Sequence, residues 1–304
     1  MADYIVMKAV EHGKLPSKFR KQYPDLKSLQ DAGWWLQKKY DGCMGIADVW
    51  NHNLGNSRML SRTGEDYTLS CGHILNELHE AMDDRHGPND WEHAAFIGEV
   101  WQPIEEAAFP TISGKFRRQN PSPELRFVVN DILPAGYTTT SPYRLRYQDV
   151  VDLLGLPGED FYKVTTAETW KNPSHFWEDP LTPALQWQGQ GGFDGAILRD
   201  PNAGYTVGTV KAGEIVKVKP TLSLDLVVED LVVQKGEKTG RNVYTLYVLY
   251  NGVRSSVGSG MPHMADECPY PGDIVEIECL GITADGKLRE PRFKGIRHDK
   301  LKPD

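Results

Sequence analysis

The chain has 304 residues, a formal net charge of −8, 39% hydrophobic residues and 25% charged residues, which is typical of a globular protein with one large or two modest domains. It has no apolar run long enough to cross a bilayer and no N-terminal signal-peptide pattern. The four cysteines form no Cys-x-x-Cys pair, which argues against a structural zinc site and a disulfide framework and favours a reducing cytoplasm.

The chain up to Pro220 mixes short helices with strands. Helical periodicity is found over residues 26–32, which end at Gly33, and over residues 72–86 and 144–154. Apolar or alternating runs predict strands over residues 34–39, 45–50, 94–101, 124–133, 193–199 and 214–219. Residues 171–190 are rich in Pro, Trp and Gln, and they form either a loop or a loosely packed helix.

Pro220 is a candidate domain boundary, because the pattern beyond it changes to short strands only. These strands are predicted over residues 224–234, 244–250, 253–257 and 273–280, with turn signals at Asn251-Gly252 and Asp285-Gly286. Short strands at this spacing fit a small barrel of the OB-fold type, and an SH3-like barrel fits the pattern nearly as well.

The segment Lys39-Tyr40-Asp41-Gly42 combines a potential nucleophile with a turn. A lysine amine is protonated near neutral pH, and it becomes a nucleophile where neighbouring cations or desolvation lower its pKa. Gly42 would let a nucleotide approach the backbone closely. The alternative for this tetrapeptide is a surface turn that ends in Asp-Gly.

Lys217 and Lys219 are the candidates for handling phosphate. They are two residues apart, so they point to the same face of a strand. Beside Lys39 they would stabilise the α-phosphate of a nucleotide and depress the pKa of Lys39 through like-charge repulsion. The alternative is the exposed face of an edge strand.

Several short segments follow Lys39 in a fixed order, and together they carry a family resemblance. They are Ser61–Gly64, Phe96–Glu99, Phe127–Pro134, Phe193–Pro201, Val216–Pro220 and Arg297–Lys300. This series resembles the motifs of covalent nucleotidyltransferases, namely DNA ligases, RNA ligases and capping enzymes. It is most similar to the short ATP-dependent DNA ligases of tailed phages, above all in DGAILRDP through VKVKP and in DGKLREPRF, and the resemblance covers nearly the whole chain.

The resemblance implies an α+β fold of two domains. Residues 1–220 would form a nucleotidyltransferase (adenylation) domain of antiparallel sheets with helices, and residues 221–304 a small all-β OB-fold barrel. The implied activity is ATP-dependent sealing of 5′-phosphate/3′-hydroxyl nicks in duplex DNA, in the cytoplasm or in the cytoplasm of a phage-infected host, by a monomer. Lys39 would carry the AMP, and Lys217, Lys219 and Asp194 would complete the catalytic set.

Further residues take roles by the same resemblance. Glu99 would bind the ribose, and Glu99 and Asp194 are the candidate ligands of Mg²⁺, which prefers oxygen ligands and bridges phosphates. Arg62 would contact the ribose or the nick phosphate, and Gln37 could hydrogen-bond the adenine amino group. Outside the first domain, Arg297 and Lys300 would reach the β- and γ-phosphates of ATP after domain closure. Surface turns, a solvated strand carboxylate and a basic tail are the alternatives for these positions.

Three positions depart from the family pattern. Met44 stands where the family has an arginine that helps to bind the 5′-phosphate, so another cation must serve. Asp194 stands where the family has glutamate and is one methylene shorter. Asn130 replaces the aromatic residue that stacks on adenine, and Phe127 or another ring is the candidate substitute.

These departures leave other functions open. The rivals are an RNA ligase, a GTP-dependent capping enzyme and a catalytically silent nucleic-acid-binding protein. The negative net charge hides basic clusters in residues 8–39 and 287–302, which could follow a phosphate backbone or form a solvated surface.

Overall fold

The computed structural model describes residues 5–84, 91–134, 139–157, 163–209, 214–236, 240–283, 285–300 and 302–303. It contains both helices and β-sheets, so the predicted α+β class is confirmed. The chain divides into two compact units, Met1–Lys219 and Pro220–Asp304. In the described residues, no helix is long and apolar enough to cross a membrane.

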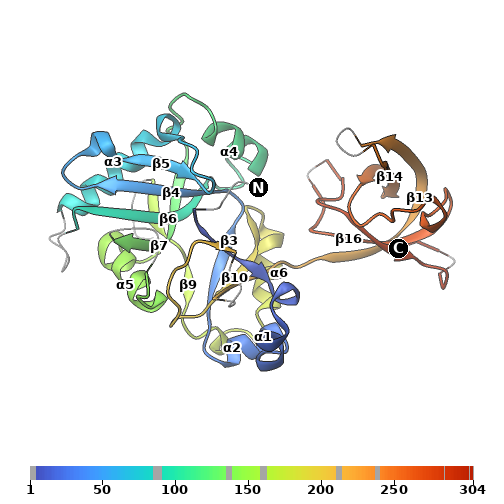
Figure 1. Ribbon diagram of the computed structural model, residues 1–304, viewed down its shortest axis with the longest axis horizontal. Coiled ribbons are helices and arrows are strands. Elements are labelled where there is room, and N and C mark those ends of the chain that lie inside the picture. The colour runs from blue at the N-terminus through green and yellow to red at the C-terminus, as the bar shows by residue number, and fades with distance from the viewer. Residues whose placement is uncertain are drawn as a thin grey trace. The chain divides into compact units, whose positions relative to one another are not determined.

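The first unit is built on two five-stranded sheets (Figure 1). One sheet has the order β2-β12-β10-β3-β9, and its strands are Val10–Glu11, Ile215–Val218, Phe193–Arg199, Trp35–Tyr40 and Thr169–Trp170. The other has the order β5-β4-β6-β7-β8, with strands Arg58–Ser61, Cys43–Trp50, His93–Trp101, Arg126–Pro134 and Val164–Thr166. A short pair joins β1 (Met7–Lys8) to β11 (Gly208–Thr209).

The sheets are mainly antiparallel, as expected, but not entirely. Three pairs are parallel: β1 with β11, β12 with β2, and β7 with β8. The predicted antiparallel arrangement is therefore confirmed for the longer pairings of the first unit and does not extend to these short ones. Neither β1, β2, β8 nor β9 is longer than three residues, which is too short for a reliable pattern in the sequence.

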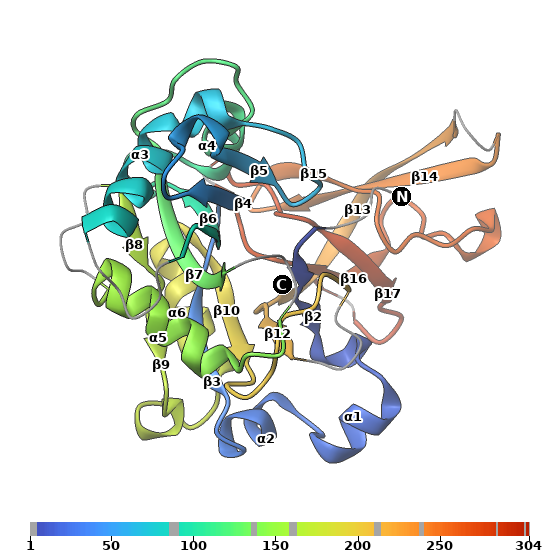
Figure 2. The same cartoon turned by 60° about the vertical axis from the view of Figure 1, so that its left-hand side comes forward.

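Helices cover the outer faces of both sheets. They are α1 (Ser17–Gln22), α2 (Leu26–Asp31), α3 (Thr68–Asp84), α4 (Phe109–Phe116), α5 (Tyr143–Leu154) and α6 (Leu181–Gln190), with 3₁₀ turns at His12–Lys14, Leu54–Asn56 and Pro173–His175. One apolar core lies between the β4–β6–β7 sheet and helices α3, α4 and α5, and a second lies between the β3–β10–β12 sheet and α1, α2 and α6. Figure 2 shows α3 and α4 over β4 and β6, with α6 beside β10.

A third core joins the two sheets face to face. Ile46, Ile97 and Leu133 of one sheet pack with Ile215 of the other and with Tyr205. Because chain connection β3–β4 passes from one sheet to the other, the segment Asp41-Gly42 stands where the sheets meet.

Local sequence accounts for most of these elements. Asp25 caps α2 by accepting a hydrogen bond from the Ser28 backbone amide at 2.8 Å, and Gly33 follows the helix with a φ of +84°, a conformation that favours glycine. The undecided segment 171–190 contains helix α6. The sequence did not predict α4, whose interior contains Gly114.

The second unit is a five-stranded sheet of order β15-β14-β13-β16-β17. Its strands are Val253–Val257, Asn242–Tyr250, Leu222–Lys235, Ile274–Cys279 and Arg292–Ile296, with a 3₁₀ turn at Ala265–Glu267. Leu226, Leu246, Val275 and Phe293 belong to its core. Among the described residues no ladder closes this sheet into a barrel, and an isolated parallel bridge joins Ser259 to Arg292 of β17.

Candidate functional site

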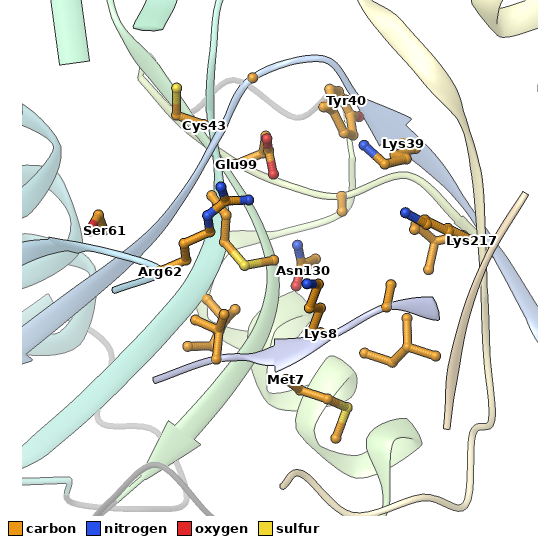
Figure 3. A pocket seen from close by; sticks show the side chains of 18 of the residues that line it. Met7, Lys8, Lys39, Tyr40, Cys43, Ser61, Arg62, Glu99, Asn130 and Lys217 are labelled. Atoms are coloured by element: carbon orange, nitrogen blue, oxygen red, sulfur yellow. The ribbon is translucent and has the colours of Figure 1, made fainter. Parts of the chain in front are cut away.

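The first unit contains a pocket of about 660 Å³ between its two sheets. Strands β3, β4 and β6 contribute walls, together with β1, the turn after β5 and the end of β12. Figure 3 shows Lys39 and Lys217 on one side of the pocket and Cys43, Ser61 and Arg62 on the other, with Glu99 between them. Basic side chains dominate the lining: Lys8, Lys38, Lys39, Arg62, Arg117, Arg199, Lys217 and Lys219, against the carboxylates of Glu65 and Glu99.

The turn Asp41-Gly42 fixes the position of Lys39 at the pocket wall. The Asp41 backbone amide donates to the carbonyl oxygen of Gly192 at 2.9 Å. A Cβ atom on Gly42 would lie 2.3 Å from the carbonyl oxygen of Val100, which is far inside van der Waals contact. Glycine is therefore required here because β6 passes so close to the turn.

Lys39, Asp194 and Lys219 form a compact charged cluster. Oδ2 of Asp194 lies 3.0 Å from Nζ of Lys39 and 2.6 Å from Nζ of Lys219. Burial raises the pKa of Asp194, but the two ammonium groups lower it more, so its pKa lies below the usual value. Asp194 is therefore ionised and binds both lysines at neutral pH.

The expected depression of the Lys39 pKa is wrong. Burial lowers the pKa of Lys39, but the carboxylates of Asp194 and Glu99 raise it more, and the net shift is upward. The cations near Lys39 do not decide its pKa, because the lysine forms an ion pair with Asp194. The Lys39 amine is therefore protonated, as an ammonium ion, at neutral pH.

Lys217 lies on β12, and Lys219 follows the last residue of that strand. Both line the pocket, but they have different partners, because Lys217 pairs with Glu11 at 3.3 Å. Burial lowers the pKa of Lys217, and Glu11 raises it less, so its net shift is downward.

Glu99 lies on β6, in the sheet opposite Lys39. Burial raises its pKa to about 7, against the lowering effect of Lys39. A carboxyl group with this pKa changes charge near neutrality, so it responds readily to a bound cation or polyanion.

Asp194 and Glu99 are suited to a magnesium ion that is shared with phosphates. Oδ1 of Asp194 is buried and has no hydrogen-bond partner, although its other oxygen binds two lysines. No group of three or more His, Cys, Asp or Glu side chains in the described residues could hold a metal alone. Mg²⁺ commonly uses one or two carboxylates plus substrate phosphates, and the residues present fit that kind of site.

Gln37 and Asn130 line the same pocket, and hydrogen bonds fix both side chains. Nε2 of Gln37 donates to the Tyr143 hydroxyl at 2.7 Å and to Oγ1 of Thr169 at 2.8 Å. Oδ1 of Asn130 accepts from Arg199 at 2.9 Å. Phe127 is fully buried in the core against helices α3 to α5, so it is not available to stack on a base.

Asn130 is hydrogen-bonded to Arg199, which belongs to a buried ionic network. Asp131, with no exposed surface, pairs with Arg146 at 2.7 Å and with Arg199 at 3.1 Å. The Arg199 guanidinium also lies over the Tyr143 ring, 4.6 Å from its centroid. The network connects two residues of the pocket lining, Asn130 and Arg199, to the buried carboxylate of Asp131.

Arg62 follows β5 and points from its side of the pocket toward Glu99 (Figure 3). Met44 lines the pocket on β4, directly opposite Glu99 in the strand pairing. The position where the family pattern has an arginine therefore offers an uncharged thioether.

Arg297 and Lys300 belong to the second unit, where both pair with the buried carboxylate of Asp225. The Arg297–Asp225 distance is 2.9 Å, and Arg297 also pairs with Asp299 at 2.8 Å. Their charges are thus balanced within that unit.

Sequence reasoning missed Lys8, Arg117 and Arg199 as pocket residues. Arg199 lies within the run Phe193–Pro201 that carries the family resemblance, so its place in that run was an available signal. Arg117 caps the C-terminus of α4. The signal for that helix is Pro110 in its first turn and the apolar spacing of Phe109, Ile112 and Phe116.

No protein-family model matches the chain, and no curated protein matches it. The fold does match several solved structures. One described as Pmar-Lig has a TM-score of 0.69 at 18% identity, covering 98% of this chain and 68% of the other. A structure of Lig E DNA ligases has a TM-score of 0.63 at 18% identity, and the match covers 96% of this chain and 98% of the other. The ATP-dependent DNA ligase of bacteriophage T7, in complex with ATP, has a TM-score of 0.52 at 20% identity, and the match covers 96% of this chain and 98% of the other. The chain has the fold of DNA ligases.

Proposed function

We propose that this protein is an ATP-dependent DNA ligase that seals 5′-phosphate/3′-hydroxyl nicks in duplex DNA through a covalent lysyl-AMP intermediate. The observation that carries the proposal is the position of Lys39 in a pocket lined by basic side chains, within a chain that has the ligase fold. A polyanion such as ATP matches this lining.

In the first step the Lys39 nitrogen attacks the α-phosphorus of ATP. A P–N bond forms, the bond to the pyrophosphate oxygen breaks, and Lys39 gives up its proton. Because Lys39 starts as an ammonium ion bound to Asp194, arrival of the nucleotide must first separate this pair. Mg²⁺ bound beside Asp194 and Glu99 would neutralise phosphate charge and compete with Lys39 for Asp194.

The remaining steps transfer AMP to the DNA and release it. The 5′-phosphate oxygen of the nick attacks the AMP phosphorus, the P–N bond breaks, and Lys39 recovers its proton. The 3′-hydroxyl then attacks the activated 5′-phosphate, and AMP leaves. Lys217 and Lys219 would stabilise the negative charge that develops on the α-phosphate, which is the main requirement of phosphoryl transfer.

The base and ribose have candidate partners in the pocket. Both amide hydrogens of Gln37 are engaged by Tyr143 and Thr169, so its carbonyl oxygen is the group that would accept the adenine amino proton. Glu99 would bind the ribose, and Arg62 would contact the ribose or the nick phosphate. We assign no aromatic ring to the adenine-stacking role that the family has at the position of Asn130.

The two compact units correspond in our proposal to an adenylation domain, residues 1–220, and an OB-type domain, residues 221–304. The strand order of the second unit and the Ser259–Arg292 bridge support the OB interpretation over an SH3-like one. Arg297 and Lys300 would leave Asp225 to bind the β- and γ-phosphates during the first step. We expect a monomeric protein that acts on nicked duplex DNA in the cytoplasm.

The test is incubation with α-labelled ATP, GTP or NAD and Mg²⁺, after pyrophosphate treatment to remove any AMP already bound. A denaturing gel and peptide mapping then locate the label. The expected result is a label from ATP on Lys39, followed by sealing of nicked DNA in preference to nicked RNA. A label from GTP alone would indicate a capping-type enzyme, and no label from folded protein would contradict the proposal.

A further inference from the structure

A group of three aromatic rings lies beside the charged pair of Lys39 and Asp194. The Tyr40 ring of β3 packs edge-on against Trp101 of β6 and against Phe193 of β10, with 5.3 Å between the ring centroids in each pair. The Trp101 and Phe193 rings stack at 6.0 Å. These three rings, called the aromatic cluster below, connect β6 of one sheet to β3 and β10 of the other.

Trp101 also holds the backbone just before Asp194. Its indole N–H donates to the carbonyl oxygen of Gly192 at 2.9 Å, and the Asp41 backbone amide donates to the same oxygen at 2.9 Å. The Gly192 carbonyl oxygen therefore connects three segments, namely β6, the turn that follows Lys39 and the start of β10.

The ladder between β10 and β3 does not hold Asp194 itself. The pairing of these strands shifts register between Phe193 and Ala196. The two residues in between, Asp194 and Gly195, face the single residue Lys39, which is the arrangement of a β-bulge. Gly195 has a φ of +103°, a conformation that favours glycine. Because a bulge bends its strand and re-aims a side chain, the direction of the Asp194 carboxylate depends on what fixes the strand beside the bulge.

The Asp194 side chain has few contacts of its own to fix it. Its Oδ2 atom contacts Nζ of Lys39 at 3.0 Å and Nζ of Lys219 at 2.6 Å, whereas its Oδ1 atom is buried without a hydrogen-bond partner. A small rotation of the bulge would therefore carry the carboxylate away from both lysines. The hydrogen bond from Trp101 to the Gly192 carbonyl oxygen opposes such a rotation, because it fixes the backbone two residues earlier.

We propose that Trp101 is a positioning residue for the first step of the reaction, because it fixes the bulge that directs the Asp194 carboxylate toward Lys39. This inference rests on the proposed ligase function, in which Lys39 attacks the α-phosphorus of ATP beside Asp194. Neither Trp101 nor Gly192 lines the pocket, so the indole acts through the residues it holds. A displacement of about 1 Å in an active site can slow a reaction by about 100-fold, and contact between the indole and a reactant is therefore not needed.

The test uses the Trp101→Phe variant of the full chain in single-turnover labelling with α-labelled ATP and Mg²⁺. Phenylalanine keeps a ring in the aromatic cluster and removes the N–H donor. The maximal rate of lysyl-AMP formation should fall about tenfold, while the ATP concentration that gives half of this rate should stay within about twofold of wild type, because the indole lies outside the pocket. Partial unfolding would look different, since it would lower the fraction of protein that is labelled.

Trp50→Phe is the matched control. Trp50 is the last residue of β4, its ring packs on His93 at 4.7 Å, and it does not line the pocket. This variant also loses a partly buried indole, and it should form lysyl-AMP at the wild-type rate.

A double-mutant cycle tests whether Trp101 acts through Asp194. In the Asp194→Asn background, adding Trp101→Phe should slow labelling by less than about twofold, because two residues that act through one contact have effects that do not add. The measurement is the same single-turnover rate, taken for both single variants and for the double variant.

The inference is overturned if Trp101→Phe forms lysyl-AMP at the wild-type rate, or if it slows labelling by the same factor with and without the Asp194 carboxylate. If Trp101→Phe does not fold, Phe193→Leu takes its place, since it removes a ring of the aromatic cluster and no hydrogen bond, and the same loss of rate is expected. Failure of the proposed function is distinguishable, because the wild-type protein itself would then form no lysyl-AMP.

Discussion

Oδ2 of Asp194 lies 3.0 Å from Nζ of Lys39, and the same oxygen binds Lys219 at 2.6 Å. The proposed nucleophile, Lys39, is therefore held as an ammonium ion by the carboxylate that would help to bind the metal. Nucleotide and metal binding would break this ion pair and leave the amine free to lose its proton. The second oxygen of Asp194, which has no hydrogen-bond partner, is available for that exchange.

Replacing Lys39 by arginine should abolish covalent labelling by ATP. Lys39→Arg keeps the cation beside Asp194 but removes the amine that forms the phosphoramide, so the melting temperature should change little. Labelling on a denaturing gel measures the first effect, and circular dichroism measures the second. Lys27→Ala, which removes an exposed lysine on α2, is the control. A labelled Lys39→Arg protein would place the nucleophile elsewhere.

The Asp194→Asn variant should alter the pH dependence of the first step. Asp194 raises the pKa of Lys39, so its neutralisation lowers that pKa and moves the rise of the adenylation rate to lower pH. The maximum rate should fall by at least tenfold, because the proposed Mg²⁺ site would lose a charged ligand. Initial rates of labelling from pH 6 to 9.5 provide the measurement. An unchanged pH profile would show that Asp194 does not control the protonation of Lys39.

The Glu99→Gln variant should change stability in a pH-dependent way. Burial raises the pKa of Glu99 from 4.5 to about 7, so the folded state binds more protons than the unfolded state between these values. This group therefore costs the wild-type protein stability as pH rises from about 4.5 to 7. Urea unfolding should find Glu99→Gln more stable than wild type at pH 8, by at most about 3 kcal/mol, with the difference shrinking at pH 5. A constant difference would contradict the raised pKa.

The Gly42→Ala variant should disturb both folding and activity. The added methyl group would lie 2.3 Å from the Val100 carbonyl oxygen, so the turn must shift. We expect the free energy of unfolding to drop by about 1–3 kcal/mol and labelling to fall more than tenfold.

Gly72→Ala in α3 is the matched control, since a Cβ atom there meets nothing within 4 Å. That variant should be more stable by about 0.5–1 kcal/mol. Equal effects of the two alanines in urea unfolding would remove the steric explanation for Gly42.

Arg297→Ala should slow self-adenylation more than it slows sealing of DNA that is already adenylated. The physical reason is that the β- and γ-phosphates, which Arg297 would bind, are present only in the first step. Comparison of ATP labelling with ligation of a synthetic adenylated nick measures the two effects separately. Because Asp225 keeps Lys300 as a partner, the sheet of the second unit should stay folded. Greater damage to sealing would contradict this role.

Local patterns in the sequence determined most of the elements. Helix spacing indicated α3 and α5, and Asp25 and Gly33 mark the limits of α2. Such features depend on neighbouring residues along the chain, so a single sequence contains the signal. Helix α4 was missed because glycine in its interior lowers its intrinsic helix propensity; it is stabilised by packing Ile112 and Phe116 into the core.

For the candidate site too, some features were predictable from the sequence and others depend on the tertiary structure. The sequence by itself indicated Lys39, Glu99, Asp194 and Lys217 as candidates, because their motifs follow one another along the chain in the order that the family resemblance requires. Only the tertiary structure decided which charges face one another. The ion pair of Lys39 with Asp194, which raises rather than lowers the lysine pKa, arises from a contact between strands that are distant in the sequence, and electrostatic energy depends on such distances.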